Sequence, residues 1–242
     1  ALGLPDLYDT GSDGTTSGGA GEWELMSSGG YGGDRRSPER PSHLSAWSKM
    51  YVGLVEPITL PRCLSSVTLP PIEKQPVAYK IPIMDQEYFL VECRLKSGFD
   101  NKLPGQGLLI WHADDRVCAE KYEDNTVNDD ENHPCLQLVE ADGRYDLRGP
   151  GGRAGAGDPF PGSKENTQWT CATKPDSKGY DRECRGIYIT DIGAPDENGC
   201  PIAWTELLNP TADSDLGRVS TEPQLKLDFS RLHLPEIELP AG

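Results

Sequence analysis

Short apolar runs separated by Pro and Gly dominate the chain from residue 54 onward, and this texture predicts β-structure. The candidate strands are residues 77–83, 87–95, 107–112, 136–140 and 186–190. Within them, residues 88–91 and 108–111 are apolar at consecutive positions. Such runs indicate interior strands that are covered on both faces. Near the end of the chain, residues 224–229 predict an edge strand or an extended tail.

The chain before residue 54 has a different pattern. Residues 10–22 contain almost no large apolar side chain and predict a flexible surface loop. Leu44, Trp47 and Tyr51 then follow one another at i, i+3 and i+7, which is typical of an amphipathic helix. We expect Ser42 to be its N-cap and Gly53 to lie near its end.

Composition narrows the choice of function. Gly and Pro make up about a fifth of the 242 residues (27 Gly and 21 Pro), which favours a loop-rich fold with many tight turns. The formal net charge of -16 disfavours nucleic acid and anionic membranes as partners. No apolar stretch approaches the roughly 18 residues of a membrane-spanning helix. The acidic residues serve either solubility outside the cell or, for a subset of them, cation binding.

The seven cysteines show no spacing that is typical of a structural zinc site. Cys118 and Cys135 bracket a polar, acidic segment, and Cys171 and Cys184 bracket another polar segment. Closing such short loops by disulfides would stabilise each by about 2–4 kcal/mol. Buried free thiols are the alternative, and an odd count leaves at least one cysteine without a partner in this chain. The pattern favours an oxidising, secreted context.

The first residues contain one half of a zinc-binding pattern. Zinc peptidases of the metzincin type carry HExxHxxGxxD or a close variant, in which the helix supplies two His ligands and a general-base Glu. The Gly then permits a turn that brings the third ligand back to the metal. Gly3 and Asp6 have the spacing of that second half. This spacing alone is common in loops, but the surrounding string is more specific.

Residues 1–9 (ALGLPDLYD) resemble the segment that follows the HExxH helix in the immune inhibitor A family of secreted bacterial metallopeptidases. Other segments are similar to the same family in the same order, so that the similarity extends over about residues 1–205. These segments are 21–29, 41–49, 88–94, 107–112, 139–143 and 158–162. The resemblance implies an α+β fold, in which the C-terminal part of a zincin-like (metzincin-like) catalytic domain is followed by a β-rich region.

The resemblance also implies roles for two residues. Asp6 would be the third zinc ligand, and Met26 would be the Met-turn residue, an apolar floor beneath the metal that does not coordinate it. An ordinary core methionine is the alternative for Met26. His43, His112 and His133 fit local structural roles better than metal binding.

The chain departs from the family at its central motif, because HExxH occurs nowhere in its 242 residues. We expect the chain to begin just after that motif and to lack any catalytic residue of its own. The expected divisions are 1–56 as the lower catalytic subdomain, 57–205 as a β-rich region packed on it, and 206–242 as a C-terminal extension or edge strand. The resemblance then implies a fragment of a secreted endopeptidase of extracellular proteins, inactive without the N-terminal part of the catalytic domain.

Acidic residues suggest a second, calcium-binding site. Asn125, Asn128 and residues 129–131 lie between Cys118 and Cys135. A second group, Glu140, Asp142, Asp146 and Asp158, lies downstream. Ca²⁺ takes six to eight oxygen ligands, which suits such loops. The candidate ligands are Asp142, Asp146 and Asp158, and a solvated acidic loop is the alternative.

These observations leave a rival function. The chain could be a non-catalytic, secreted, calcium-stabilised β-rich binding module. The sequence encoded upstream of Ala1 distinguishes the two hypotheses, because only the peptidase requires an HExxH there.

Overall fold

The computed structural model describes residues 2–11, 16–32, 38–60 and 63–206. These described residues belong to one compact unit. The predicted C-terminal extension, including the candidate strand at 224–229, lies outside the described residues apart from Glu206, where the last strand ends.

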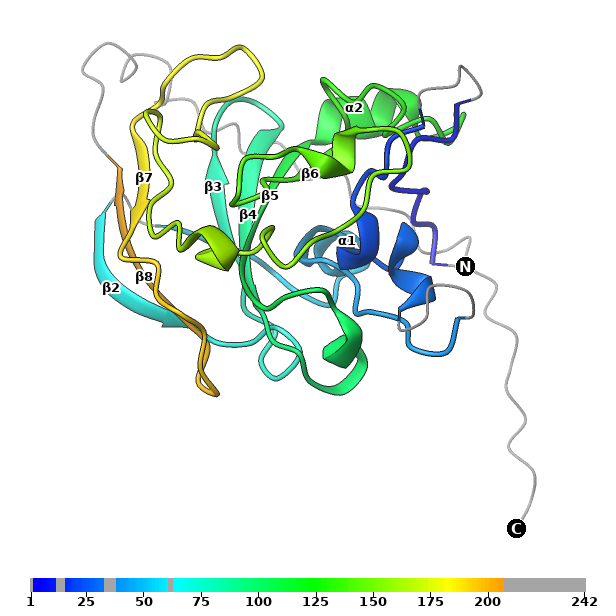
Figure 1. The fold of residues 1–242 in the computed structure, drawn as a ribbon. Coiled ribbons are helices and arrows are strands. Elements are labelled where there is room, and N and C mark those ends of the chain that lie inside the picture. Colours follow the sequence, from blue (N-terminus) through cyan, green and yellow to red (C-terminus); the bar gives the residue numbers. More distant parts are fainter. Residues whose placement is uncertain (1, 12–15, 33–37, 61–62, 207–242) are drawn as a thin grey trace. The chain divides into compact units, whose positions relative to one another are not determined.

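Two sheets form the framework (Figure 1). The larger sheet has five strands in the order β1-β3-β4-β5-β6. Its strands are β1 (Ile58–Thr59), β3 (Tyr79–Pro82), β4 (Glu87–Arg94), β5 (Gly107–Asp114) and β6 (Leu136–Leu138). The smaller, antiparallel sheet has the order β2-β8-β7, with strands β2 (Cys63–Leu69), β8 (Cys200–Glu206) and β7 (Ile187–Thr190).

Strands β4 and β5 are the interior strands that the sequence predicts. They pair antiparallel over eight residues each, and every residue in both is buried. Leu90 and Trp111 belong to one core, whereas the alternate residues Phe89 and Ile110 belong to a second core. The continuous apolar runs therefore reflect a sheet with a hydrophobic core on each face.

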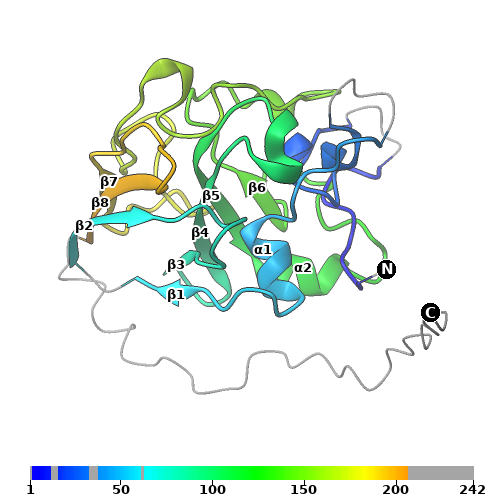
Figure 2. The same ribbon diagram turned by 90° about the horizontal axis from the view of Figure 1, so that it is seen from below.

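The two cores contain different partners. The first core contains residues of the N-terminal segment and the helices, including Leu7, Trp23 and Trp47. The second contains residues of the smaller sheet, including Ile189 and Ile202. Figures 1 and 2 accordingly show α1 (Ala46–Tyr51) and α2 (Asp115–Lys121) on one side of the five-stranded sheet and the small sheet on the other.

Helix α1 begins later than the pattern predicts. Its N-cap is Ser45, whose side chain accepts a hydrogen bond from the backbone N–H of Ser48, so the expectation of Ser42 as N-cap is wrong. Ser42 instead lies in the preceding extended segment, where its N–H donates to the carbonyl of Gly29 at 2.8 Å. Gly53 does follow the helix end, with φ at +76°. The described residues also contain five 3₁₀ turns: Gly21–Trp23, Ser28–Tyr31, Gly98–Lys102, Asp146–Arg148 and Gly162–Lys164.

Three disulfides are present, and they confirm two predicted pairings. Cys118 pairs with Cys135, and Cys171 with Cys184. The third, Cys93–Cys200, joins β4 of the large sheet to β8 of the small one. The side chain of Cys63 lies outside the part that the structure describes. Helices and sheets together confirm the α+β class.

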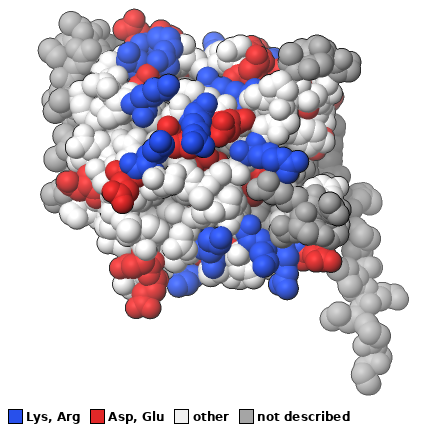
Figure 3. Space-filling model, viewed as in Figure 1, with Lys and Arg blue, Asp and Glu red and all other residues white. Residues whose placement is uncertain are grey.

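The surface carries both signs of charge. Figure 3 shows Lys and Arg side chains interspersed with Asp and Glu on the face seen in Figure 1, so the acidic excess is not uniform there. Exposed ion pairs such as Arg182 with Asp176, at 2.6 Å, contribute little to stability. None of the helices in the described residues has the length and apolarity needed to cross a bilayer.

Candidate metal centre

Asp6 lies in an extended segment at the edge of the first core. Its neighbours Pro5 and Leu7 are buried, and Leu7 is fully enclosed in that core. The alternation leaves the Asp6 side chain half-buried at the surface of the core. Gly3 has φ at +72°, a conformation that glycine adopts without strain. The turn at Gly3 therefore precedes Asp6, as the motif implies.

The Asp6 carboxylate has a specific partner. Its Oδ2 accepts a hydrogen bond from Nδ2 of Asn125 at 2.8 Å, and its backbone N–H donates to Oδ1 of the same residue at 2.9 Å. Tyr8 lies near the carboxylate as well: partial burial and then the negative charge of Asp6 raise the pKa of Tyr8. Asp6 and Asn125 are separated by 119 residues, so no local pattern in the sequence indicates that they pair.

Met26 lies next to the Asp6 segment. Its backbone carbonyl accepts a hydrogen bond from the N–H of Leu7 at 2.9 Å. The Met26 side chain is half-buried and packs against the first core. This backbone hydrogen bond connects the turn around Met26 to Leu7, the residue that directly follows Asp6. A core methionine and a Met-turn residue would both have these contacts.

A buried carboxylate, Glu24, supports the turn around Met26. Glu24 is fully buried, and its Oε1 accepts a hydrogen bond from the Met26 N–H at 3.0 Å. Its Oε2 accepts from the Ser45 N–H at 2.7 Å and from Ser48 Oγ at 3.0 Å. Burial raises the pKa of Glu24, and these hydrogen bonds oppose that shift. The carboxylate therefore links the turn to the first turn of α1.

Arg94 of β4 supports the same region from the sheet. Its fully buried guanidinium forms two 2.7 Å hydrogen bonds to Asp100 and donates to the carbonyls of Trp23 and His43. Burial would raise the pKa of Asp100, but the Arg94 guanidinium outweighs it and holds that pKa below its ordinary value. Arg94 thus connects the large sheet to the Gly21–Trp23 turn and to the segment that precedes α1.

The three histidines considered as ligands have other partners. The His43 ring packs edge-on against Phe99. His112 Nε2 lies 2.7 Å from Glu87 Oε1, and His133 Nε2 lies 2.8 Å from Asp114 Oδ2. Among the described residues, no group of three metal-ligating side chains includes Asp6. A zinc ion at Asp6 would therefore need ligands from elsewhere.

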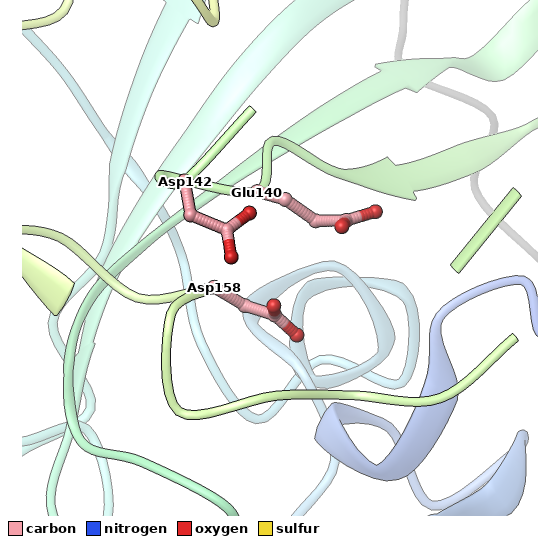
Figure 4. Close-up of side chains that lie close together, drawn as sticks. All are labelled: Glu140, Asp142 and Asp158. Atoms are coloured by element: carbon pink, nitrogen blue, oxygen red, sulfur yellow. The ribbon is translucent and has the colours of Figure 1, made fainter. Parts of the chain in front are cut away.

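Three carboxylates do come together away from Asp6. Ligand atoms of Glu140, Asp142 and Asp158 all lie within 4.8 Å of one another (Figure 4). Glu140 and Asp142 follow β6, and Asp158 lies in a later loop. The Ala141 N–H donates to the Asp158 carbonyl at 2.9 Å, which fixes the two segments side by side. The downstream group of the sequence is thus partly assembled in space.

Each buried member of this trio already accepts hydrogen bonds. Glu140 accepts from the backbone N–H groups of Asp146 at 2.6 Å and Leu147 at 3.1 Å. Asp158 Oδ2 accepts from Trp23 Nε1 at 2.8 Å. Asp146 itself is exposed and is not a member of the trio among the described residues. Of the three candidate calcium ligands, the structure therefore brings together Asp142 and Asp158, with Glu140 as the third carboxylate.

Burial and the neighbouring negative charges raise the pKa values of Glu140 and Asp158, the two buried carboxylates. Burial and then the Asp158 charge raise the pKa of Glu140 to about 7. Burial raises the pKa of Asp158 to about 6, and the charges of Asp142 and Asp146 add a smaller increase. Hydrogen bonds from Trp23 and Gly155 oppose this shift. Oxygen-rich sites of this kind suit Ca²⁺, with remaining ligands from carbonyls or water.

The acidic loop between Cys118 and Cys135 is used differently. Asn128 is buried, and its side chain bonds the backbone of Leu136 and the carbonyl of Leu7. Asp129 Oδ1 accepts from the Thr10 N–H at 2.9 Å. These side chains therefore hold the chain together rather than forming a cluster of carboxylates.

Comparison with known families agrees with the first part of the chain. Residues 1–55 match the family model of the immune inhibitor A peptidase M6 catalytic domain. This match confirms the resemblance to immune inhibitor A-like metallopeptidases and supports a catalytic-domain fragment. No curated protein matches the chain.

Proposed function

We propose that this chain, which resembles the immune inhibitor A peptidases over residues 1–55, is part of a secreted zinc-dependent endopeptidase with Asp6 as the third zinc ligand. Met26 would lie beneath the metal as the Met-turn residue. Zinc in such a site polarises the substrate carbonyl and lowers the pKa of its bound water to about 7. The substrates would be peptide bonds of extracellular proteins.

One observation carries this proposal. Residues 1–55 match the family, and within them the Leu7 N–H to Met26 carbonyl hydrogen bond joins the Met26 turn to the residue that follows Asp6. A third ligand and a Met-turn need that adjacency, since both must lie at the same metal. Disulfides agree with secretion, because they persist in oxidising compartments.

The chain by itself should not cleave protein substrates. It has no HExxH, so the general-base Glu and two His ligands would have to come from the N-terminal part of the catalytic domain. We expect no chelator-sensitive cleavage of a protein substrate such as casein by the purified 242-residue chain. Turnover that zinc restores after chelation would contradict this expectation.

The proposed zinc role of Asp6 requires an HExxH segment before Ala1, and it is tested in a chain that carries such a segment. Asp6→Ala should weaken zinc binding, measured by competition with a chelator, and should abolish cleavage. Asp85→Asn, at an exposed turn, is the matched control and should behave as wild type. Equal zinc affinity in Asp6→Ala and wild type would rule out Asp6 as a ligand.

We also propose that Glu140, Asp142 and Asp158 bind Ca²⁺, which would stabilise the fold. Their clustering and the raised pKa of both buried members support a cation there. A calcium concentration of 100 times Kd would stabilise the folded state by about 2.7 kcal/mol.

The calcium site is tested by thermal unfolding of the 242-residue chain in calcium and in chelator. Wild type should gain about 5–10 °C in Tm, given 2–4 °C per kcal/mol for a domain of this size. Asp142→Asn should lose most of that gain. Asp146→Asn is the matched control and should keep the gain, because Asp146 is exposed and is not one of the three clustered carboxylates. If the wild-type Tm is the same in calcium and in chelator, the three carboxylates do not bind Ca²⁺.

The acidic trio also favours a second candidate function, a non-catalytic, calcium-stabilised binding module. That function needs no zinc and no HExxH. A degenerate sequence upstream of Ala1, together with a calcium-dependent Tm, would support the module and not the peptidase.

A further inference from the structure

The loop between Cys118 and Cys135 folds back along the N-terminal segment that carries Asp6. Tyr122 Oη donates to the Gly3 carbonyl at 2.7 Å, and Asn128 Nδ2 donates to the Leu7 carbonyl at 3.1 Å. Further along, Thr10 Oγ1 donates to the Asn125 carbonyl at 3.0 Å. The contacts thus flank Asp6 on both sides in sequence.

This loop is itself firmly held. A disulfide closes it over a separation of 17 residues. Val127 at its centre is fully buried, and its carbonyl accepts from the Cys135 N–H at 2.9 Å. The buried side chain of Asn128 bonds both the N–H and the carbonyl of Leu136, which begins β6. The loop can therefore act as a rigid support for the segment that it contacts.

Asn125 is the loop residue that contacts the side chain of Asp6. Its amide forms two reciprocal hydrogen bonds, one to the Asp6 carboxylate and one from the Asp6 N–H. Because both bonds involve one planar amide, they fix the carboxylate relative to its own backbone. The amide is neutral, so it orients the carboxylate without cancelling the charge that a metal cation would require.

We propose that Asn125 is a positioning residue, which fixes the Asp6 carboxylate in the orientation needed to bind zinc. The inference rests on the proposed function, in which Asp6 is a zinc ligand. Hydrogen bonds from outside a metal's ligand shell orient ligands in this way, and their loss costs roughly 10- to 100-fold in metal affinity. The disulfide-closed loop supplies the rigidity that makes such an orientation useful.

The backbone of Asn125 suggests the appropriate variant. Its φ is +55°, in the left-handed region that Asn and Gly tolerate better than other residues. Asn125→Gly therefore removes the amide without forcing a strained backbone. Thr10→Ala is the matched control, because it removes hydrogen bonds between the same loop and the same segment without touching Asp6.

Two measurements test the proposal. Hydrogen exchange on the 242-residue chain should show the amide of Asp6 exchanging roughly tenfold faster in Asn125→Gly than in wild type, because its acceptor is lost. In the chain that carries an HExxH segment before Ala1, which the proposed function requires, zinc affinity should fall roughly 10- to 100-fold in Asn125→Gly and stay within about twofold of wild type in Thr10→Ala.

The outcomes distinguish failure of the positioning role of Asn125 from failure of the zinc-ligand role of Asp6. If Asp6→Ala weakens zinc binding but Asn125→Gly does not, the positioning role is overturned and the proposed function stands. Equal losses in Asn125→Gly and Thr10→Ala would overturn it too, because loop docking in general would then be responsible. If Asp6→Ala itself leaves zinc affinity unchanged, the proposed function fails and this inference fails with it.

Discussion

The His112 imidazole is buried on β5 in an aromatic stack. Its ring lies 4.5 Å from Phe89 and 4.0 Å from Tyr180, measured between centroids. Glu87 bonds the imidazole, and Asp114 and His133 are the other titratable groups that act on it. Burial lowers the pKa of His112, and this effect outweighs the Glu87 carboxylate, which raises it.

A lowered pKa gives a definite sign to the effect of pH on stability. The unfolded chain takes up a proton on this His near pH 6.5, whereas the folded chain does so at a lower pH. The stabilising contribution of neutral His112 is therefore present above about pH 6.5 and is lost as the pH falls toward the folded pKa. The pKa of Glu87 is lowered too, but that contribution is lost only below about pH 4.3.

We predict that His112→Gln removes one contribution that lowers the unfolding free energy as the pH falls from 7 to 5.5. The raised pKa values of Glu140 and Asp158 act in the opposite direction over this range, so the variant is compared with wild type at each pH. One proton changes that free energy by at most about 1.4 kcal/mol per pH unit. Urea unfolding at several pH values measures the slope. A variant lacking His112 with an unchanged slope would assign the pH dependence to other groups.

At the scale of elements, local patterns predict β3 to β7 but not the two-residue strand β1, nor β2 and β8, which pair over a long distance. Strands β3 to β7 lie within or close to their predicted ranges, because their apolar runs are continuous or alternating. Strands β2 and β8 were not predicted. Pro201 interrupts the pattern of β8, and its partner strand β2 lies more than 130 residues earlier. Helix α2 is short and mostly polar, so it shows little apolar periodicity.

Local sequence patterns likewise predict only part of the candidate site. Its motif residues, Asp6 and Met26, are recognisable in sequence because they lie in a short string that matches a family. Their supports are not: Asn125 comes from a loop 119 residues away, and Arg94 comes from the central sheet. Glu24 adjoins the motif, but nothing in the sequence shows that its carboxylate is buried. Partners chosen by tertiary packing leave no local signature.

At the scale of the whole molecule, the two cores share the sheet of β4 and β5, and one covalent link reinforces the second core. Cys93 of β4 and Cys200 of β8 are both fully buried there. The link spans 107 residues, whereas Cys171–Cys184 spans 13 within one loop. A longer closed loop removes more entropy from the unfolded chain, so the two disulfides should stabilise the fold unequally.

We therefore predict that Cys93→Ala with Cys200→Ala destabilises the chain more than Cys171→Ala with Cys184→Ala. The loop-closure relation gives about 4.7 kcal/mol for a loop near 100 residues and about 3 kcal/mol for one near 15. Urea unfolding without reductant measures both losses against wild type. In the first variant, the small sheet should also lose hydrogen-exchange protection before β4 and β5, since only it depends on that link to the central sheet. Equal losses in the two double variants would mean that packing of the second core, and not chain entropy, holds the two sheets together.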